Sequence, residues 1–180
     1  MNDTMQAVLG EIAQVLEKVD ALQFEALQQA LPKTRRVFVS GEGRVGLVCR
    51  CFAMRLGHIG YTAYVCGETI TPALQPGDVL LAVSGSGESG YTVADAQKAK
   101  KKGARVCVIT AKPASTLASL ADQILVLPGT LRGDSGEARG SIQLLSSLYD
   151  QSLHVLLDVL ALQLSRQSGT SNEAATQNHW

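Results

Sequence analysis

The six residues Ser84–Ser89 (SGSGES) constrain the fold of this chain more than any other stretch. The run Asp78–Val83 (DVLLAV) precedes them and predicts a buried strand, because continuous apolar residues are typical of strands covered on both faces. Apolar residues at helical spacing follow, from Val93 to Ala99, and predict a helix. The chain is therefore expected to pass from a strand through a tight glycine turn into a helix.

This serine-glycine loop has the composition of an anion-binding site. Gly85 and Gly87 let the backbone adopt positive φ and expose its N–H groups, while Ser84, Ser86 and Ser89 supply hydroxyl donors. The start of the following helix adds further N–H groups and a partial positive charge. We expect a phosphoester as the ligand. The alternative is an ordinary turn before a helix that one of these serines caps.

Composition limits the number of domains and the class of ligand. The chain has 180 residues, 46% of them apolar, which is enough for one well-buried domain. A formal net charge of zero and an aromatic content of 4% argue against a nucleic-acid-binding surface. The basic run Lys98–Lys102 is interpreted as a solvated helix end.

The cysteines and the hydropathy pattern indicate a reducing compartment. Cys49, Cys51, Cys66 and Cys107 form no C-x-x-C pair, so free thiols are expected rather than disulfides or a metal site. No secretory leader and no run of membrane-spanning length is recognised. We expect a cytoplasmic protein without a membrane partner.

Strands and helices are expected to alternate along the chain. The expected strands are residues 36–40, 62–66, 80–84, 105–110 and 123–127. This alternation predicts a three-layer αβα sandwich around a five-stranded parallel sheet, of the flavodoxin or Rossmann type. The segments of the single domain are a helical pair at 3–31, the α/β core at 35–128, a mobile loop at 129–141, a long helix at 142–165 and a polar tail at 166–180.

A second glycine loop, residues 41–46 (GEGRVG), follows the first expected strand. Its spacing fits the dinucleotide fingerprint G-x-G-x-x-G, and Glu68 lies where the ribose-binding acid would be expected. Dinucleotide binding therefore remains an alternative, although it leaves the serine-glycine loop unexplained. In parallel sheets ligands bind beyond the carboxyl ends of the strands, and Ser40, Glu68 and Thr71 are expected at that edge.

These motifs together resemble the sugar isomerase (SIS) domain, and within it the 6-phospho-3-hexuloisomerase family. The resemblance runs nearly end to end. The segments that carry it are residues 41–47 (GEGRVGL), 52–56 (FAMRL), 67–69 (GET), 71–72 (TP) and 84–89 (SGSGES).

The resemblance implies interconversion of D-arabino-3-hexulose 6-phosphate and D-fructose 6-phosphate, without metal or other cofactor. It also implies a homotetramer, arranged as a dimer of dimers, that acts in the ribulose monophosphate pathway. The partner is then a small phosphorylated sugar. The residues that would bind it are Ser40, Gly43, Arg44, Val45, Ser84, Gly85, Ser86, Gly87, Glu88 and Ser89, with Glu68 and Thr71 as further candidates.

The resemblance also implies a catalytic carboxylate at Asp150. The family has a glutamate there, so the base of this chain is one methylene shorter. Val45 replaces a serine of the family, and its H-A-N-L-E ending appears only as His179 and Trp180. We expect His179 to assist ring opening or proton shuttling, supplied by a neighbouring chain.

One positioned carboxylate suffices for the implied reaction. Asp150 would take the proton from C2 and return it to C3 through an enediol, and burial beneath the apolar last helix would raise its pKa. The alternative for Asp150 is an exposed helix acid. The alternative for Arg44 is a structural ion pair. The alternative for Glu68 and Thr71 is a turn whose polar groups bond to one another. Glu88 either caps the helix or contacts the sugar. An isomerase of another phosphosugar, or a non-catalytic phosphosugar sensor, are the competing functions.

Overall fold

Five parallel strands form the central sheet, in the order β2-β1-β3-β4-β5. The computed structural model describes residues 2–179. The strands are β1 (Val37–Ser40), β2 (Ala63–Val65), β3 (Val79–Val83), β4 (Arg105–Thr110) and β5 (Gln123–Val126). Because the winding direction reverses between β1 and β3, the carboxyl ends of these two strands flank the crevice in which such sheets bind ligands. The predicted sheet is confirmed.

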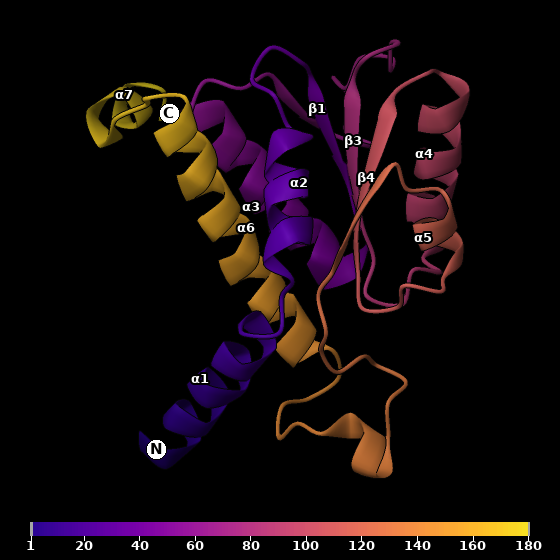
Figure 1. Cartoon of the computed structure of the whole chain (residues 1–180), viewed down its shortest axis with the longest axis vertical. Coiled ribbons are helices and arrows are strands. Elements are labelled where there is room, and N and C mark those ends of the chain that lie inside the picture. Colours follow the sequence, from indigo (N-terminus) through magenta and orange to yellow (C-terminus); the bar gives the residue numbers. More distant parts are fainter. Residues whose placement is uncertain (1, 180) are drawn as a thin grey trace.

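Helices cover both faces of the sheet (Figure 1). The helices α2 (Ala21–Gln29), α3 (Gly43–His58) and α6 (Ser147–Gln167) pack on one face, and α4 (Gly90–Lys101) and α5 (Thr116–Ser119) pack on the other. The remaining elements are α1 (Asn2–Leu16), the 3-10 turn η1 (Gly136–Arg139) and α7 (Asn172–Gln177). Of the described helices, none has the length and apolar character needed to span a membrane.

The alternation of side chains along the strands divides the core in two. Leu81 of β3 faces α3 and α6, while Leu80, its neighbour in the chain, faces α4. Both side chains are fully buried. A strand buried on both faces explains why the sequence shows a continuous apolar run before the serine-glycine loop.

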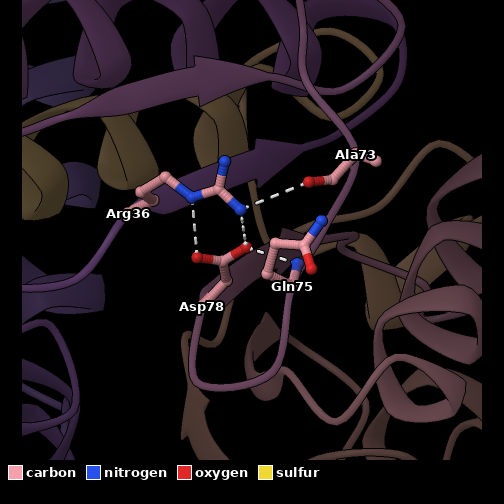
Figure 2. A network of polar contacts seen from close by, with 4 residues as sticks. All are labelled: Arg36, Ala73, Gln75 and Asp78. Atoms are coloured by element: carbon pink, nitrogen blue, oxygen red, sulfur yellow. Dashed lines mark hydrogen bonds and ion pairs between the residues drawn. The ribbon is translucent and has the colours of Figure 1, made fainter.

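A bidentate ion pair fixes the edge of the sheet opposite the crevice (Figure 2). The guanidinium of Arg36, just before β1, donates to both carboxylate oxygens of Asp78, just before β3, at 2.9 and 2.5 Å. Asp78 also accepts from the peptide N–H of Gln75 at 2.6 Å, and Arg36 donates to the carbonyl of Ala73 at 3.2 Å. The pair therefore holds the amino ends of β1 and β3 in register, and its hydrogen bond to Asp78 raises the pKa of Arg36.

Two helix boundaries differ from the sequence-based expectation. The helix after β1 begins at Gly43 rather than near Leu47, so the second glycine loop is itself part of the helix start. The last long helix begins at Ser147 rather than at residue 142. Leu145 has a φ of +52°, which is incompatible with a right-handed helix, and this turn delays the helix start.

The segment at 166–180 was expected to be a tail, and this expectation is wrong for most of it. The helix α6 continues to Gln167 and α7 follows. The hydroxyl of Ser171 caps α7 by accepting from the N–H of Ala174 at 3.2 Å, and the amide of Asn178 donates to the carbonyl of His58 at 2.9 Å. The bond from Asn178 docks the segment on the end of α3, and no periodicity in a polar sequence predicts such a contact.

The loop at 129–141 connects the sheet to α6 and is anchored at its far end. The carboxylate of Glu11 in α1 accepts from the Ser141 hydroxyl and the Ile142 N–H, both at 2.8 Å, and from the Gln143 amide at 2.9 Å. Figure 1 shows α1 extending away from the sheet on the side where this loop lies. The anchor keeps the chain that leads into α6 close to α1.

Candidate active site

A cleft of about 530 Å³ lies at the carboxyl ends of β1 and β3. It is formed by the start of α3, the serine-glycine loop, the loop at 129–141 and the start of α6. Its volume falls in the range of small-molecule sites. The lining residues are Glu42, Gly43, Arg44, Val45, Ser84, Gly85, Ser86, Ser89, Leu131, Arg132, Leu145, Ser146, Tyr149 and Asp150.

Three serine hydroxyls gather on one side of this cleft. The Oγ of Ser84 lies 2.9 Å from the Oγ of Ser89 and 3.5 Å from the Oγ of Ser86. Ser84 also accepts from the peptide N–H of Gly87 at 3.1 Å, so the turn and the hydroxyl cluster support each other. Hydroxyl donors in this arrangement match the acceptor oxygens of a phosphate.

Glycine is required at the two positions of the loop for different structural reasons. A Cβ on Gly85 would lie 2.6 Å from the Leu131 side chain and 3.3 Å from the Tyr149 ring, so the loop packs directly against these residues. Gly87 has a φ of +71°, and a Cβ there would lie 2.0 Å from the hydroxyl of Ser115. A side chain at either position would clash with these neighbours.

Asp150 lies opposite, in the first turn of α6, with only 2% of its surface exposed. Its Oδ2 accepts from the hydroxyl of Ser146 at 3.0 Å and lies 3.5 Å from the Nε of Arg44. Its buried Oδ1 has no hydrogen-bond partner among the described residues. Desolvation by burial raises the pKa of Asp150, and the hydrogen bond from Ser146 and the charge of Arg44 partly offset that rise. The exposed-acid alternative is thereby excluded.

Arg44 links α3 to the start of α6. Besides its ion pair with Asp150, it donates to the hydroxyl of Ser147 at 2.7 Å. More than half of its side chain is exposed, so it also faces the space where a ligand would lie. The ion-pair alternative for Arg44 is thus present in the structure. Arg132, from the loop at 129–141, brings a second guanidinium to the cleft.

Three predicted binding residues do not line the cleft: Ser40, Gly87 and Glu88. Ser40 alternates with Val39 along β1, so its hydroxyl points to the α4 face and donates to Asp95 at 2.7 Å. The carboxylate of Glu88 accepts from the N–H of Thr116 at 2.8 Å and therefore caps α5. Glu88 thus caps a helix, but the capped helix is α5 and not α4, the helix that directly follows the loop.

The two further pocket candidates also lie outside the lining of the cleft. Glu68 forms an exposed ion pair with Arg50, with 2.9 Å between Nη2 and Oε1. The hydroxyl of Thr71 donates to the carbonyl of Val65 at 2.5 Å, which satisfies the turn after β2. Glu68 and Thr71 both follow β2, which is an edge strand of the sheet.

His179 lies at the other end of α3 from the cleft. Its ring contacts that of His58, with 4.9 Å between ring centroids. Burial lowers the pKa of His58, and the neighbouring His179 and Arg55 lower it further. Because α3 has 16 residues and rises about 1.5 Å per residue, a role of His179 in catalysis would require the cleft of a neighbouring chain.

The sequence analysis missed six residues that line the cleft. They are Glu42, Leu131, Arg132, Leu145, Ser146 and Tyr149. Glu42 lies within the second glycine loop, and Ser146 lies one helical turn before Asp150. Their positions in the sequence could therefore have predicted both as lining residues. Leu131 and Arg132 lie in an aperiodic loop, and no local pattern places them here.

Within the described residues, no group of three or more His, Cys, Asp or Glu side chains is arranged to hold a metal ion. The four cysteines are free thiols, two of them buried. The polar side chains that line the cleft carry hydroxyls, two guanidinium groups and two carboxylates. This set can bind a phosphorylated polyol and move a proton.

Comparisons with known proteins agree on one family. Residues 30–131 match the model of the SIS domain. A 3-hexulose-6-phosphate isomerase of Mycobacterium gastri is 41% identical over 160 residues, which are 89% of this chain and 80% of that protein. Another 3-hexulose-6-phosphate isomerase, from Bacillus subtilis, is 32% identical over 172 residues, 96% of this chain and 93% of its own length. A crystal structure of a hypothetical protein superposes with a TM-score of 0.89 at 31% identity, over 98% of this chain and 94% of that one.

Proposed function

The chain belongs to the SIS domain family, among relatives named 3-hexulose-6-phosphate isomerases, and on that basis we propose that it is a phosphosugar isomerase. The reaction is the interconversion of D-arabino-3-hexulose 6-phosphate and D-fructose 6-phosphate. The observation that supports this most directly is a buried carboxylate, Asp150, in the same cleft as the serine cluster of Ser84, Ser86 and Ser89.

Asp150 acts as the base in this proposal. Its carboxylate removes the proton from C2 of the 3-ketose, and the electron pair of that C–H bond forms the C2–C3 double bond of an enediolate. The negative charge moves to the oxygen at C3. The acid form of Asp150 then returns the proton to C3. The hydroxyl proton at C2 passes to the charged oxygen at C3, and the C2–O bond becomes the new carbonyl. A carboxylate whose pKa is raised by burial is suited to both transfers.

The serine-glycine loop holds the phosphate at a distance from the reacting carbons. Hydroxyl groups of Ser84, Ser86 and Ser89 donate to phosphate oxygens, and Arg132 supplies a positive charge. Binding energy from a group that does not react can position the carbons that do. Arg44, which already contacts Asp150, faces the developing enediolate oxygen.

Deuterium exchange tests the proposal. Purified protein is incubated with fructose 6-phosphate in D₂O and followed by proton NMR. The proposed reaction predicts deuterium at C3 and a new signal from the 3-ketose. Exchange at C1 instead would indicate an isomerase that acts between C1 and C2. Binding of the sugar phosphate without any exchange would indicate a sensor.

An isomerase for a different phosphosugar is the second candidate. Val45 places an apolar side chain in the cleft, and Asp150 is shorter than a glutamate. Both features change the space around the sugar hydroxyls. The same exchange assay with a panel of aldose and ketose phosphates separates this candidate from the first.

The proposal also covers the oligomeric state, the compartment and the pathway of the protein. We propose a cytoplasmic homotetramer that acts in the ribulose monophosphate pathway. Exposed apolar side chains on α1 (Met5, Leu9) and on α6 (Val155, Val159, Leu162) support association, because such surface is usually covered in an assembly. The four free thiols are consistent with a reducing compartment. Sedimentation velocity of the purified protein tests the tetramer.

A further inference from the structure

The residue before α6 does not behave as an ordinary helix cap. Ser146 is the N-cap of α6, yet its hydroxyl makes no capping hydrogen bond to the helix backbone. It donates instead to Oδ2 of Asp150 at 3.0 Å, one helical turn further on. A serine at an N-cap usually satisfies a free N–H of the first turn. Here the hydroxyl bonds to the carboxylate of Asp150 and leaves the N–H groups of the first turn without this cap.

The turn that delivers Ser146 is held in an unfavourable backbone conformation. Leu145, directly before it, has a φ of +52°, a left-handed conformation that is unfavourable for a residue with a Cβ. The Leu145 side chain is 61% exposed, so burial of that side chain does not compensate for this cost. The strained turn lies in the lining of the cleft and ends at the hydroxyl that holds Asp150.

The two oxygens of Asp150 are consequently unequal. Oδ2 is engaged by Ser146 and lies near Arg44, whereas the buried Oδ1 has no partner among the described residues. A buried acceptor without a partner is costly, and such atoms concentrate at functional sites. Among the described residues, Ser146 thus provides the hydrogen bond that orients this carboxylate.

We propose that Ser146 is a positioning residue for the reaction: its hydrogen bond to Oδ2 fixes the orientation of the Asp150 carboxylate, so that the base is held in place beside the sugar. This inference rests on the proposed function, in which Asp150 is the base. The hydrogen bond stops rotation of the carboxylate about its Cβ–Cγ bond. A fixed orientation matters because displacement of a catalytic group by about an ångström can cost on the order of a hundredfold in rate.

Removal of the Ser146 hydroxyl is expected to leave the other charged groups around the carboxylate in place. Arg44 faces it from α3, Arg132 and Glu42 line the same cleft, and the buried phenol of Tyr149 is its neighbour in α6. A change in the titration of Asp150 after removal of one hydroxyl can therefore be assigned to that hydroxyl.

The test compares Ser146→Ala with Ser146→Thr and with Ser165→Ala. Ser165 is a half-buried serine on the same helix, and its hydroxyl donates to a backbone carbonyl in its own turn. We expect Ser146→Ala to lower kcat by about 10-fold to 100-fold, the range for a hydrogen bond to a charged group, with KM changed by no more than about 2-fold. The acidic limb of the kcat/KM profile moves to higher pH. Ser146→Thr retains the hydroxyl and restores most of kcat, and Ser165→Ala is unchanged.

A titration separates this inference from the proposed function. The Asp150 carboxyl is followed by ¹³C NMR, with Asp150→Asn identifying its signal, and its midpoint is expected at higher pH in Ser146→Ala than in the unaltered protein. If the unaltered protein fails to isomerise any phosphosugar, the proposed function is overturned. If it isomerises and Ser146→Ala matches it in kcat, pH profile and carboxyl titration, the role of Ser146 is overturned. Far-UV circular dichroism of each variant confirms that α6 still forms.

Discussion

The carboxylate of Glu42 accepts a hydrogen bond from the peptide N–H of Tyr91 at 3.0 Å. The same oxygen accepts from the N–H of Thr92 at 3.3 Å. Glu42 therefore connects the second glycine loop, at the start of α3, to the first turn of α4, directly after the serine-glycine loop. Since the carboxylate already occupies the positive end of α4, we expect the phosphate to be held by the serine hydroxyls rather than by this helix end.

Replacement of Glu42 by alanine is expected to destabilise the fold. The two N–H groups at the start of α4 would lose their acceptor, which typically costs about 0.5–2 kcal/mol. Urea denaturation followed by circular dichroism measures this as a lower midpoint. Glu42→Gln keeps an acceptor oxygen and should retain most of the stability. Equal midpoints for the alanine variant and the unaltered protein would show that the cap contributes nothing.

Ser86→Ala is expected to weaken the binding of phosphorylated ligands. The lost interaction is a hydrogen bond to a charged phosphate, so the binding free energy should fall by about 1–2 kcal/mol. Isothermal titration calorimetry with fructose 6-phosphate measures it. Ser119→Ala, on the exposed face of α5, is the matched control. Unchanged affinity in Ser86→Ala would remove this serine from the phosphate site.

Arg132→Ala is expected to raise KM for the sugar phosphate by about tenfold, with a smaller effect on kcat. The reason is that Arg132 lines the cleft from the loop at 129–141, while Arg44 is already engaged with Asp150 and Ser147. A charge contact to phosphate is worth about 1.5 kcal/mol, or roughly tenfold in affinity. Steady-state kinetics measure the effect, and Arg105→Ala, at the amino end of β4, is the control. A KM equal to that of the control would place the phosphate elsewhere.

Asp150→Asn is expected to reduce kcat by a factor of about 10²–10⁴, the usual contribution of a general base. Binding of the sugar phosphate should stay near normal, because the amide has the same shape as the carboxyl group. Exchange in D₂O and calorimetry measure the two effects. Retained exchange in this variant would assign the base to another residue.

The same substitution is expected to stabilise the fold at neutral pH. Burial raises the pKa of Asp150, so the native state binds the proton more tightly than the unfolded chain does. The ionised carboxylate therefore costs stability above its native pKa, and this cost disappears as the pH falls below the pKa of an ordinary aspartate. The difference in urea midpoint between Asp150→Asn and the unaltered protein should thus be positive at pH 7 and shrink toward pH 4. A less stable variant at pH 7 would contradict the raised pKa.

The strands and the two glycine loops were predictable because they depend on local rules. Apolar runs such as the one in β3 and glycines at positive φ such as Gly87 are recognisable from a few neighbouring residues. The beginning of α6 could not be predicted in this way, because Leu145 adopts a backbone conformation that its residue type does not favour. The helix α7 was missed because a polar segment folds there through its contacts with the end of α3.

The candidate site was predictable only in part. Gly43, Arg44, Val45 and the serines of the loop do line the cleft, because parallel strands bring their carboxyl ends to one edge. Ser40 and Glu88 lie at the same edge but point to other partners, which strand alternation and helix capping decide. A position at the edge of a sheet does not fix the direction of a side chain.

Residue types at short, fixed spacings were enough to predict the parallel sheet, the two glycine turns and the family. The packed structure was needed to establish that Asp150 is buried, that Ser146 and Arg44 share its Oδ2, and that Arg132 reaches the cleft. These contacts join segments as far apart as α3 and α6. Their energies depend on desolvation and on atomic distances, which arise only when the layers of the domain pack together.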